Sequence, residues 1–198
     1  RILRAVLEVG EKGMEELGRE RTSQLGVVLL FAHKELRVAA SNGLSADDRD
    51  AVFPGEEGVL AEALSKARAI VVDDPAEDSE LWKLTSLRDC KQAIVVPLRA
   101  GFETFGVVIF GNTEPGIYTE DLVNLLTAIC NQATVALQNA QLYQDLREEK
   151  ERIVSVEEDA RKKLARNLHD GPTQNIASIA MQTSFARRLI EDSSDLER

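Results

Sequence analysis

The sequence predicts an α+β fold in which an antiparallel sheet is flanked by helices and followed by one long helix. Two short runs rich in β-branched residues, 93–98 and 105–110, are separated by a few residues of hairpin length. Strands joined this closely pair antiparallel, and helical patterns lie on both sides of them along the chain. From Thr119 to Asp170 no Gly or Pro interrupts the sequence, which predicts a helix much longer than those of ordinary globular domains.

Composition limits the class of protein. The chain has 198 residues, of which 43% are hydrophobic and 29% charged, enough for one domain with a buried core and an appended element. Its net charge of −10 argues against direct binding to nucleic acid or to an anionic membrane. No apolar run is long enough to span a membrane and no signal peptide opens the chain, so we expect a cytoplasmic location. Because the chain begins with Arg1 rather than Met, we expect a longer parent protein, and a membrane tether upstream is left open.

Apolar periodicity and turn residues place the remaining elements of the sheet domain. In order, they are an amphipathic helix at 1–20, a buried strand at 25–32, a turn at 33–35, a strand at 36–40, a polar loop at 44–57, a helix near 57–67, a strand at 69–73, a short helix around 82–84, and the hairpin strands at 93–98 and 105–110. Thr119 can cap the long helix, and Glu120 and Asp121 suit the positive end of its dipole.

The long helix carries an imperfect heptad pattern. Its two registers are Leu146, Ile153 and Ala160, and Leu142, Glu149 and Val156. Polar Glu149 interrupts an otherwise apolar seam, so we expect a coiled coil or a helical-bundle dimer with one weak layer. Acidic residues stand four positions before basic ones, which favours the helix; the pairs are Glu157 with Arg161, Glu158 with Lys162, and Asp159 with Lys163.

The residues that point to chemistry lie near the end of the chain. His169 is followed directly by Asp170, and Gln174 stands four positions after Asp170, on the same helix face. An imidazole is a nucleophile near neutral pH that can carry a phosphoryl group, and a neighbouring carboxylate can accept its proton or orient it. Arg161, Lys162 and Arg166 could be phosphate ligands, but a solvated charged face, which also includes Lys163, is the preferred interpretation. Pro172 predicts a bend after His169, and we take Gly171-Pro172 as a hypothetical flex point.

The first part of the chain resembles a GAF domain. The resemblance rests on Pro54-Gly55-Glu56-Glu57-Gly58 before a helix, on the strand Ala69–Asp74, on Val96-Pro97-Leu98 followed by Phe105-Gly106-Val107-Val108, and on the helix that follows Tyr118. It implies helices on one face of the sheet and a small-molecule pocket on the other. The ligand is unknown, and a domain that only dimerises and relays a signal is an equal alternative.

Three side chains could in principle indicate which ligand the predicted pocket binds. Cys90 lacks the neighbouring histidine of bilin-attaching relatives, so a structural thiol is the preferred interpretation. His33 could ligate haem, but its predicted turn favours an ordinary surface histidine. Cys130 falls on the apolar side of a helix and is predicted to be a core residue. Two cysteines are too few for a disulfide framework or a metal site, so we expect reduced thiols and no metal.

The run from Glu157 to Gln174 resembles the H-box of sensor histidine kinases, in the branch of the bacterial nitrate/nitrite sensors. It departs from the family pattern at Asn167 and in the spacing of Lys162-Lys163-Leu164. The resemblance implies that His169 accepts the γ-phosphoryl of ATP and passes it to a response-regulator aspartate. It also implies that Asp170 accepts a proton or orients the ring, and that Gln174 positions a water for dephosphorylation.

The two resemblances together predict a domain organisation and a set of partners. We expect a GAF-like sensor at 1–145, a signalling-helix linker at 146–160, and the incomplete first helix of a phosphoacceptor domain at 161–198. ATP and Mg²⁺ are expected in a catalytic domain that this chain lacks, so the chain has no cofactor of its own and is expected to be inactive alone. The expected partners are a second copy, a response regulator and a possible small-molecule ligand. The alternative is a non-catalytic GAF module with a coiled-coil connector.

Overall fold

The computed structural model describes residues 2–16 and 24–195. For residues 15, 16, 24, 168–175 and 189–195 it describes only the backbone. Contacts divide the chain into two units, Arg1–Gln141 and Leu142–Arg198. The first unit contains the sheet, and the described part of the second is helical. The finer predicted division into a linker at 146–160 and a phosphoacceptor helix at 161–198 stays a prediction.

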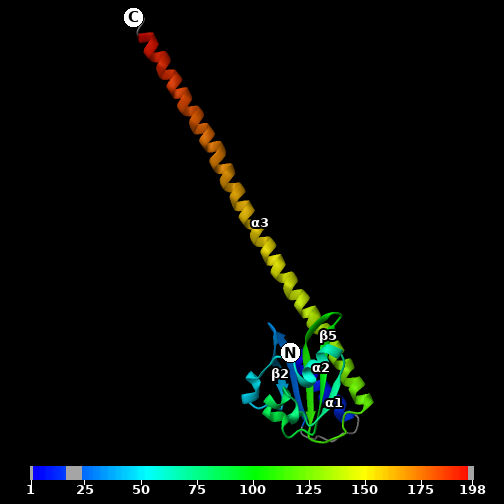
Figure 1. Ribbon diagram of the computed structural model, residues 1–198. Coiled ribbons are helices and arrows are strands. Elements are labelled where there is room, and N and C mark those ends of the chain that lie inside the picture. Colours follow the sequence, from blue (N-terminus) through cyan, green and yellow to red (C-terminus); the bar gives the residue numbers. More distant parts are fainter. Residues whose placement is uncertain (1, 17–23, 196–198) are drawn as a thin grey trace. The chain divides into compact units, whose positions relative to one another are not determined.

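The described residues form one six-stranded antiparallel sheet in the order β3-β2-β1-β6-β5-β4 (Figure 1). The strands are β1 (Gln24–Ala32), β2 (Glu35–Asn42), β3 (Val52–Phe53), β4 (Ile70–Asp73), β5 (Gln92–Ala100) and β6 (Glu103–Asn112). The predicted α+β class and the five predicted strands are confirmed. β3 lies in a segment predicted to be loop, and that prediction was wrong. Two residues carry too little local signal, and β3 exists because it pairs with Leu36 and Arg37 of β2.

The helices also follow the prediction closely. They are α1 (Ile2–Glu16), α2 (Gly58–Lys66) and α3 (Glu120–Asp195), with 3₁₀ turns η1 (Asp47–Asp50), η2 (Pro75–Glu77), η3 (Leu81–Lys83) and η4 (Thr85–Leu87). Residues 17–20, the end of the first predicted helix, lie outside the described residues. The backbone carbonyl of Thr119 accepts a hydrogen bond of 2.9 Å from the N–H of Val123 as α3 begins.

Two apolar clusters fill the two faces of the sheet, because successive strand residues point to opposite sides. Val28, Ile94 and Val108 pack under α1 and the first part of α3. Val27, Val95 and Ile109 pack under α2 and the 3₁₀ turns. Strands buried on both faces have continuous apolar sequences rather than alternating ones, which explains the runs at 25–32 and 93–98.

α3 is helical through Gly171 and Pro172. The sequence predicted a bend there, but the structure assigns one helix from Glu120 to Asp195. Proline removes one backbone donor, and the helical turns on either side keep their own hydrogen bonds, so the helix continues past it. The hypothesis that Gly171-Pro172 flexes during signalling stays a prediction.

Candidate functional site

The phosphoacceptor candidate lies in the second unit. The backbone is helical at His169, Asp170 and Gln174, which places Asp170 and Gln174 about one helical turn apart. His33, the other histidine of the chain, is exposed in the turn between β1 and β2, where its φ is +64°. The predicted turn position of His33 is therefore confirmed.

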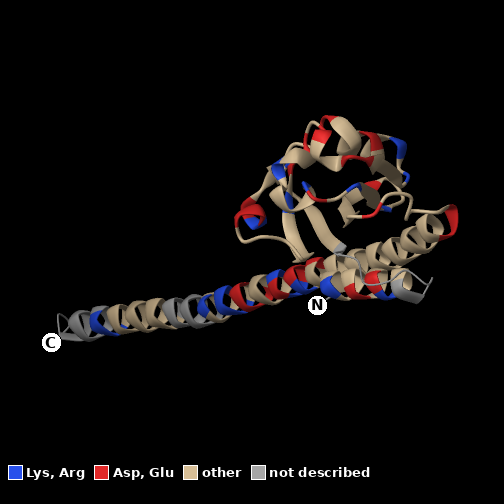
Figure 2. Ribbon diagram, turned by 90° about the horizontal axis from the view of Figure 1, so that it is seen from below, with Lys and Arg blue, Asp and Glu red and all other residues tan. Residues whose placement is uncertain are grey.

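Charged side chains of both signs cover α3 before the candidate histidine, and Figure 2 shows blue and red alternating along this part of the helix. Residues 157–167 are all exposed. The structure pairs Lys162 Nζ with Asp159 Oδ1 at 3.9 Å, three positions away, instead of with the predicted Glu158. Side chains three and four positions apart are both neighbours on a helix, and exposed pairs differ little in energy. This solvated face agrees with the preferred interpretation of the basic residues.

The heptad positions after residue 141 include apolar side chains that no described residue of the same chain covers. Leu146 is 66% exposed and Ile153 is 56% exposed, and Leu142 and Val156 are exposed as well. Within a single chain these side chains would remain in water. A seam of this kind becomes buried only against another helix.

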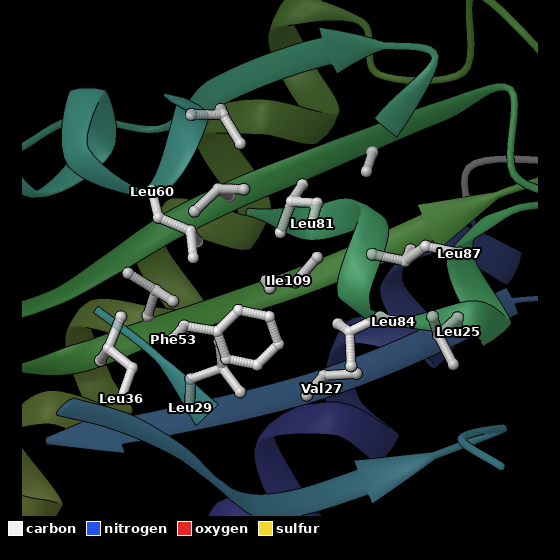
Figure 3. Close-up of a cluster of buried hydrophobic side chains, with 14 of the residues drawn as sticks. Leu25, Val27, Leu29, Leu36, Phe53, Leu60, Leu81, Leu84, Leu87 and Ile109 are labelled. Carbon is white, nitrogen blue, oxygen red and sulfur yellow. The ribbon is translucent and has the colours of Figure 1, made fainter. Parts of the chain in front are cut away.

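The sheet face where the GAF resemblance implies a pocket is occupied by the protein's own side chains (Figure 3). Leu81, Leu84 and Leu87 come from the 3₁₀ turns and are fully buried beside Phe53 and Leu60. They pack on strand residues such as Val27 and Ile109. The described side chains therefore form an apolar core over this face, and a ligand for it stays a prediction.

Three carboxylates hold the segment that carries those leucines, and sequence analysis missed all of them. Asp48 and Glu80 are buried, and Asp78 is half-buried. Asp48 is 2% exposed, and its carboxylate accepts hydrogen bonds from the backbone N–H and the hydroxyl of both Thr85 and Ser86, at 2.6–2.9 Å. Its residue type suggested only a polar loop. The donors lie 37 and 38 positions away, so no local signal could have identified them.

The other two carboxylates hold the entry to α2. Glu80 is 3% exposed and accepts N–H bonds of 2.9 Å from Gly55, Glu56 and Glu57. Asp78 Oδ2 accepts the N–H of Val59 at 2.8 Å, near the N-terminus of α2, where a negative charge is favoured. Among the described residues, no buried side-chain polar atom lacks a hydrogen-bond partner. These carboxylates thus have a structural role, because each one holds backbone N–H groups of the loops around α2 and the 3₁₀ turns.

The hydrogen bonds of Asp48 should make the stability of the domain depend on pH. Burial by itself raises the pKa of this carboxyl, but the bonds from Ser86 and Thr85 outweigh it and lower the pKa from 3.8 to about 2. Between pH 3.8 and about 2, the unfolded chain therefore binds more protons at this carboxyl than the folded chain does. The stabilisation by Asp48 is fully present above pH 3.8 and is lost as the pH falls through about 2. We expect Asp48→Asn to lower the free energy of unfolding by about 2 kcal/mol at neutral pH.

The measurement for Asp48 is urea unfolding of wild type and variant across that pH range. The difference between them should shrink as the pH approaches 2. Asp47→Asn is the matched control, because Asp47 is exposed in the same 3₁₀ turn and should change stability little. A difference between wild type and Asp48→Asn that does not depend on pH would contradict the role of the charge.

Both cysteines lie in the described part of the chain and are free, buried thiols. Burial, with a smaller contribution from Asp89, raises the pKa of Cys90 to about 11. Burial raises the pKa of Cys130 to about 12. The predicted core position of Cys130 is confirmed, since this α3 side chain is fully buried in the apolar cluster between the helix and the sheet. A buried thiol that stays protonated is a poor nucleophile, which agrees with a structural role for Cys90.

We expect neither cysteine to react with a thiol reagent in the native protein at pH 8. Only the thiolate reacts, and the raised pKa values together with burial keep both groups protonated and covered. Titration with Ellman's reagent checks this: the folded chain should release almost no chromophore, and the chain in denaturant should release two equivalents, because it has two cysteines. Rapid native reaction of one equivalent would contradict the burial of that thiol.

These features define the class of protein. An antiparallel sheet with α1, α2 and the start of α3 on its faces is followed, along α3, by a His-Asp-x-x-x-Gln run at residues 169–174. This combination is similar to that of sensor histidine kinases. The chain belongs to the GAF domain family, whose model matches residues 4–138, and the model of the histidine kinase family matches residues 160–198.

Related proteins agree with this assignment. An uncharacterized sensor-like histidine kinase of Chloroflexus aurantiacus is 41% identical over 168 residues, which are 84% of this chain and 28% of that protein. The signal transduction histidine-protein kinase/phosphatase DegS of Bacillus subtilis is 31% identical over 81 residues, which are 37% of this chain and 20% of DegS. The chain therefore spans less than a third of the length of these relatives.

Solved structures support the fold alone, because their sequences are distant. The GAF domain of a two-component sensor histidine kinase from Bacillus halodurans has a TM-score of 0.57 at 17% identity, covering 72% of this chain and 97% of that one. The second GAF domain of DevS from Mycobacterium smegmatis has a TM-score of 0.54 at 20% identity, covering 73% and 96%. Within the described residues, every helix is too short or too polar to cross a membrane.

Proposed function

We propose that this chain is the sensory and phosphoacceptor part of a two-component sensor histidine kinase. The observation that carries the proposal is the match of the histidine kinase family to residues 160–198, which contain the His169-Asp170 pair and Gln174. The helix α3 begins on the sheet of the GAF domain and includes residues 160–195 of this segment. A change in the sensor domain can therefore reach the phosphoacceptor along one helix.

Each of the three residues has a role in the proposal. His169 attacks the γ-phosphoryl of ATP and later passes the group to an aspartate of a response regulator. Asp170 accepts the ring proton or holds the imidazole in its reactive orientation. Gln174 positions the water that removes the phosphoryl group from the regulator, in keeping with the kinase/phosphatase name of the relative DegS.

The proposal also names what the chain needs from outside. The phosphoryl donor is ATP with Mg²⁺, bound in a catalytic domain elsewhere in the parent protein. The partners are a response regulator and a second copy of this chain, whose long helix covers the exposed seam at Leu146 and Ile153. We place the protein in the cytoplasm, where ATP and the regulator are found.

Phosphoryl transfer to the chain itself tests the proposal. The 198-residue chain is mixed with the ATP-binding domain of a related kinase and with radiolabelled ATP and Mg²⁺. We expect label on the chain that is labile in acid and stable in alkali, as a phosphorylated imidazole is. An unlabelled chain would favour the alternative, a non-catalytic GAF module whose helix serves only as a connector.

A further inference from the structure

A depression of ≈ 210 Å³ lies between the edge of the sheet and the first part of α3. Its sheet side is lined by Arg68, which precedes β4, and by Arg99, near the end of β5. Its helix side is lined by Thr127 and Asn131, one turn apart on α3. All of these residues belong to the first of the two units.

The depression is present because β4 covers only the first part of β5. β4 pairs with residues 92–95, and β5 continues to Ala100. α2 ends at Lys66, and Ala67 then adopts a left-handed conformation with a φ of +51°. This conformation turns the chain at the end of a helix. Residues 67–69 therefore lie beside the uncovered part of β5, and Arg68 lines the depression from there.

Arg99 is held at the depression by the turn that follows it. Its Nε donates a hydrogen bond of 2.8 Å to the backbone carbonyl oxygen of Gly101. The register between β5 and β6 shifts between Leu98 and Arg99, and an irregularity of this kind redirects a side chain. The bond to Gly101 uses Nε alone, so it leaves both NH₂ groups of the guanidinium to donate to another acceptor.

The charges of the two arginines are not neutralised by nearby acids. Among the described residues, neither Arg68 nor Arg99 is part of an ion pair, and no acidic side chain lines the depression. Glu62 interacts with Arg68, but its pKa is lowered chiefly by the hydrogen bond from Lys66, at 2.6 Å, and least by Arg68. Two cations that share a depression repel each other, and a bound anion would remove that repulsion.

The α3 side of the depression adds one polar donor. Asn131 is exposed, and its side-chain amide can donate hydrogen bonds. Thr127 differs, because its hydroxyl already donates to the carbonyl oxygen of Val123 at 2.7 Å. Guanidinium groups bind carboxylate and phosphate oxygens through paired N–H donors. The depression therefore offers charged donors from the sheet edge and a neutral donor from the helix.

We propose that this depression binds a small oxyanion, a carboxylate or a phosphate, between Arg68 and Arg99 of the sheet edge and Asn131 of α3. Sites for drug-sized ligands have volumes of roughly 300–1,000 Å³, so the smaller volume here selects a small anion. The bound anion joins the sheet edge to the first part of α3 by hydrogen bonds. This inference does not depend on the proposed phosphoacceptor function.

Titration of the ¹⁵N-labelled 198-residue chain with sodium acetate, and separately with sodium phosphate, tests the inference by NMR at constant ionic strength. Sodium chloride is the reference salt. We expect saturable shifts of the backbone amide signals of Arg68, Gly101 and Asn131, with a dissociation constant of about 1–10 mM. Saturation by acetate alone identifies a carboxylate site, saturation by phosphate alone identifies a phosphate site, and saturation by both identifies a general oxyanion site. Absence of saturation by either anion, or equal saturation by chloride, would overturn the proposal.

Variants of the lining residues locate the anion. Arg68→Gln and Arg99→Gln should each raise the dissociation constant by about tenfold or more, because each removes charged donors. Arg88→Gln is the matched control, since Arg88 is exposed in the same domain and does not line the depression, and it should change the constant by less than about twofold. Unchanged binding in both lining variants, or an equal loss in Arg88→Gln, would contradict the site.

Asn131→Lys gives a result that a folding defect cannot imitate. It adds a third cation at the depression and removes neither arginine, so the dissociation constant should fall by about threefold or more. Binding that is no tighter in this variant would overturn the α3 side of the site. Radiolabel on His169 is measured in a separate experiment, so failure of anion binding leaves the phosphoacceptor role to its own test.

Discussion

Replacing His169 with glutamine is expected to remove all acid-labile phosphoryl label from this chain, and replacing His33 with glutamine is expected to remove none. Phosphoryl transfer needs a nucleophilic lone pair aligned with the γ-phosphorus. The imidazole nitrogen supplies one, whereas the amide nitrogen of glutamine has its lone pair delocalised into the carbonyl. Glutamine also favours helix, so the variant should keep the backbone of α3.

The chain offers an unusually clean control for this experiment, because it contains two histidines. His33 is exposed in the β1–β2 turn of the sheet domain and lies outside the segment that matches the histidine kinase family. The measurement is radiolabel on the chain after incubation with a related ATP-binding domain, followed by acid and alkali treatment. Label retained in His169→Gln, or lost in His33→Gln, would contradict the assignment of the acceptor.

Replacing Gly106 with alanine is expected to destabilise the sheet domain by more than about 4 kcal/mol, enough to prevent stable folding. Gly106 lies in β6 between two neighbouring strands and pairs with Leu30 of β1 and Leu98 of β5. A Cβ atom there would overlap the carbonyl oxygen of Leu29 and lie 2.8 Å from Cα of Leu30. Both are backbone atoms of a buried strand, so they cannot move aside without breaking the β1–β6 ladder.

Gly101→Ala is the matched control for this substitution. Gly101 lies in the turn between β5 and β6, its φ is +60°, and nothing lies within 4 Å of the position where a Cβ would be. The cost should therefore be only the backbone strain, about 1–2 kcal/mol. Urea unfolding followed by circular dichroism compares the two variants. Equal midpoints for Gly106→Ala and Gly101→Ala would show that β1 and β6 are not held as closely as the structure has them.

Several features of the fold could be predicted because their signals are local. The runs at 93–98 and 105–110 are β-branched over enough consecutive residues to predict strands, and the uninterrupted sequence after Thr119 predicted α3. β3 was missed because a two-residue strand has no periodicity of its own. The interruption expected at Pro172 did not appear, because a local preference against helix was outweighed by the helix on both sides.

The carboxylates that hold the loops show where prediction from sequence stops. Asp48, Asp78 and Glu80 look like ordinary polar loop residues, and only the fold brings each one to its donors, such as the N–H groups of Gly55 and Val59.

The sequence by itself determined the α+β class, the GAF and histidine kinase family resemblances, and His169, Asp170 and Gln174 as the candidate chemistry. These are carried by the periodicity and identity of residues close together in the chain. Tertiary structure alone decided that the loop carboxylates are structural and that Leu81, Leu84 and Leu87 fill the second face of the sheet. Burial and hydrogen-bond partners depend on contacts between residues far apart in sequence, and such contacts leave no pattern in the chain before it folds.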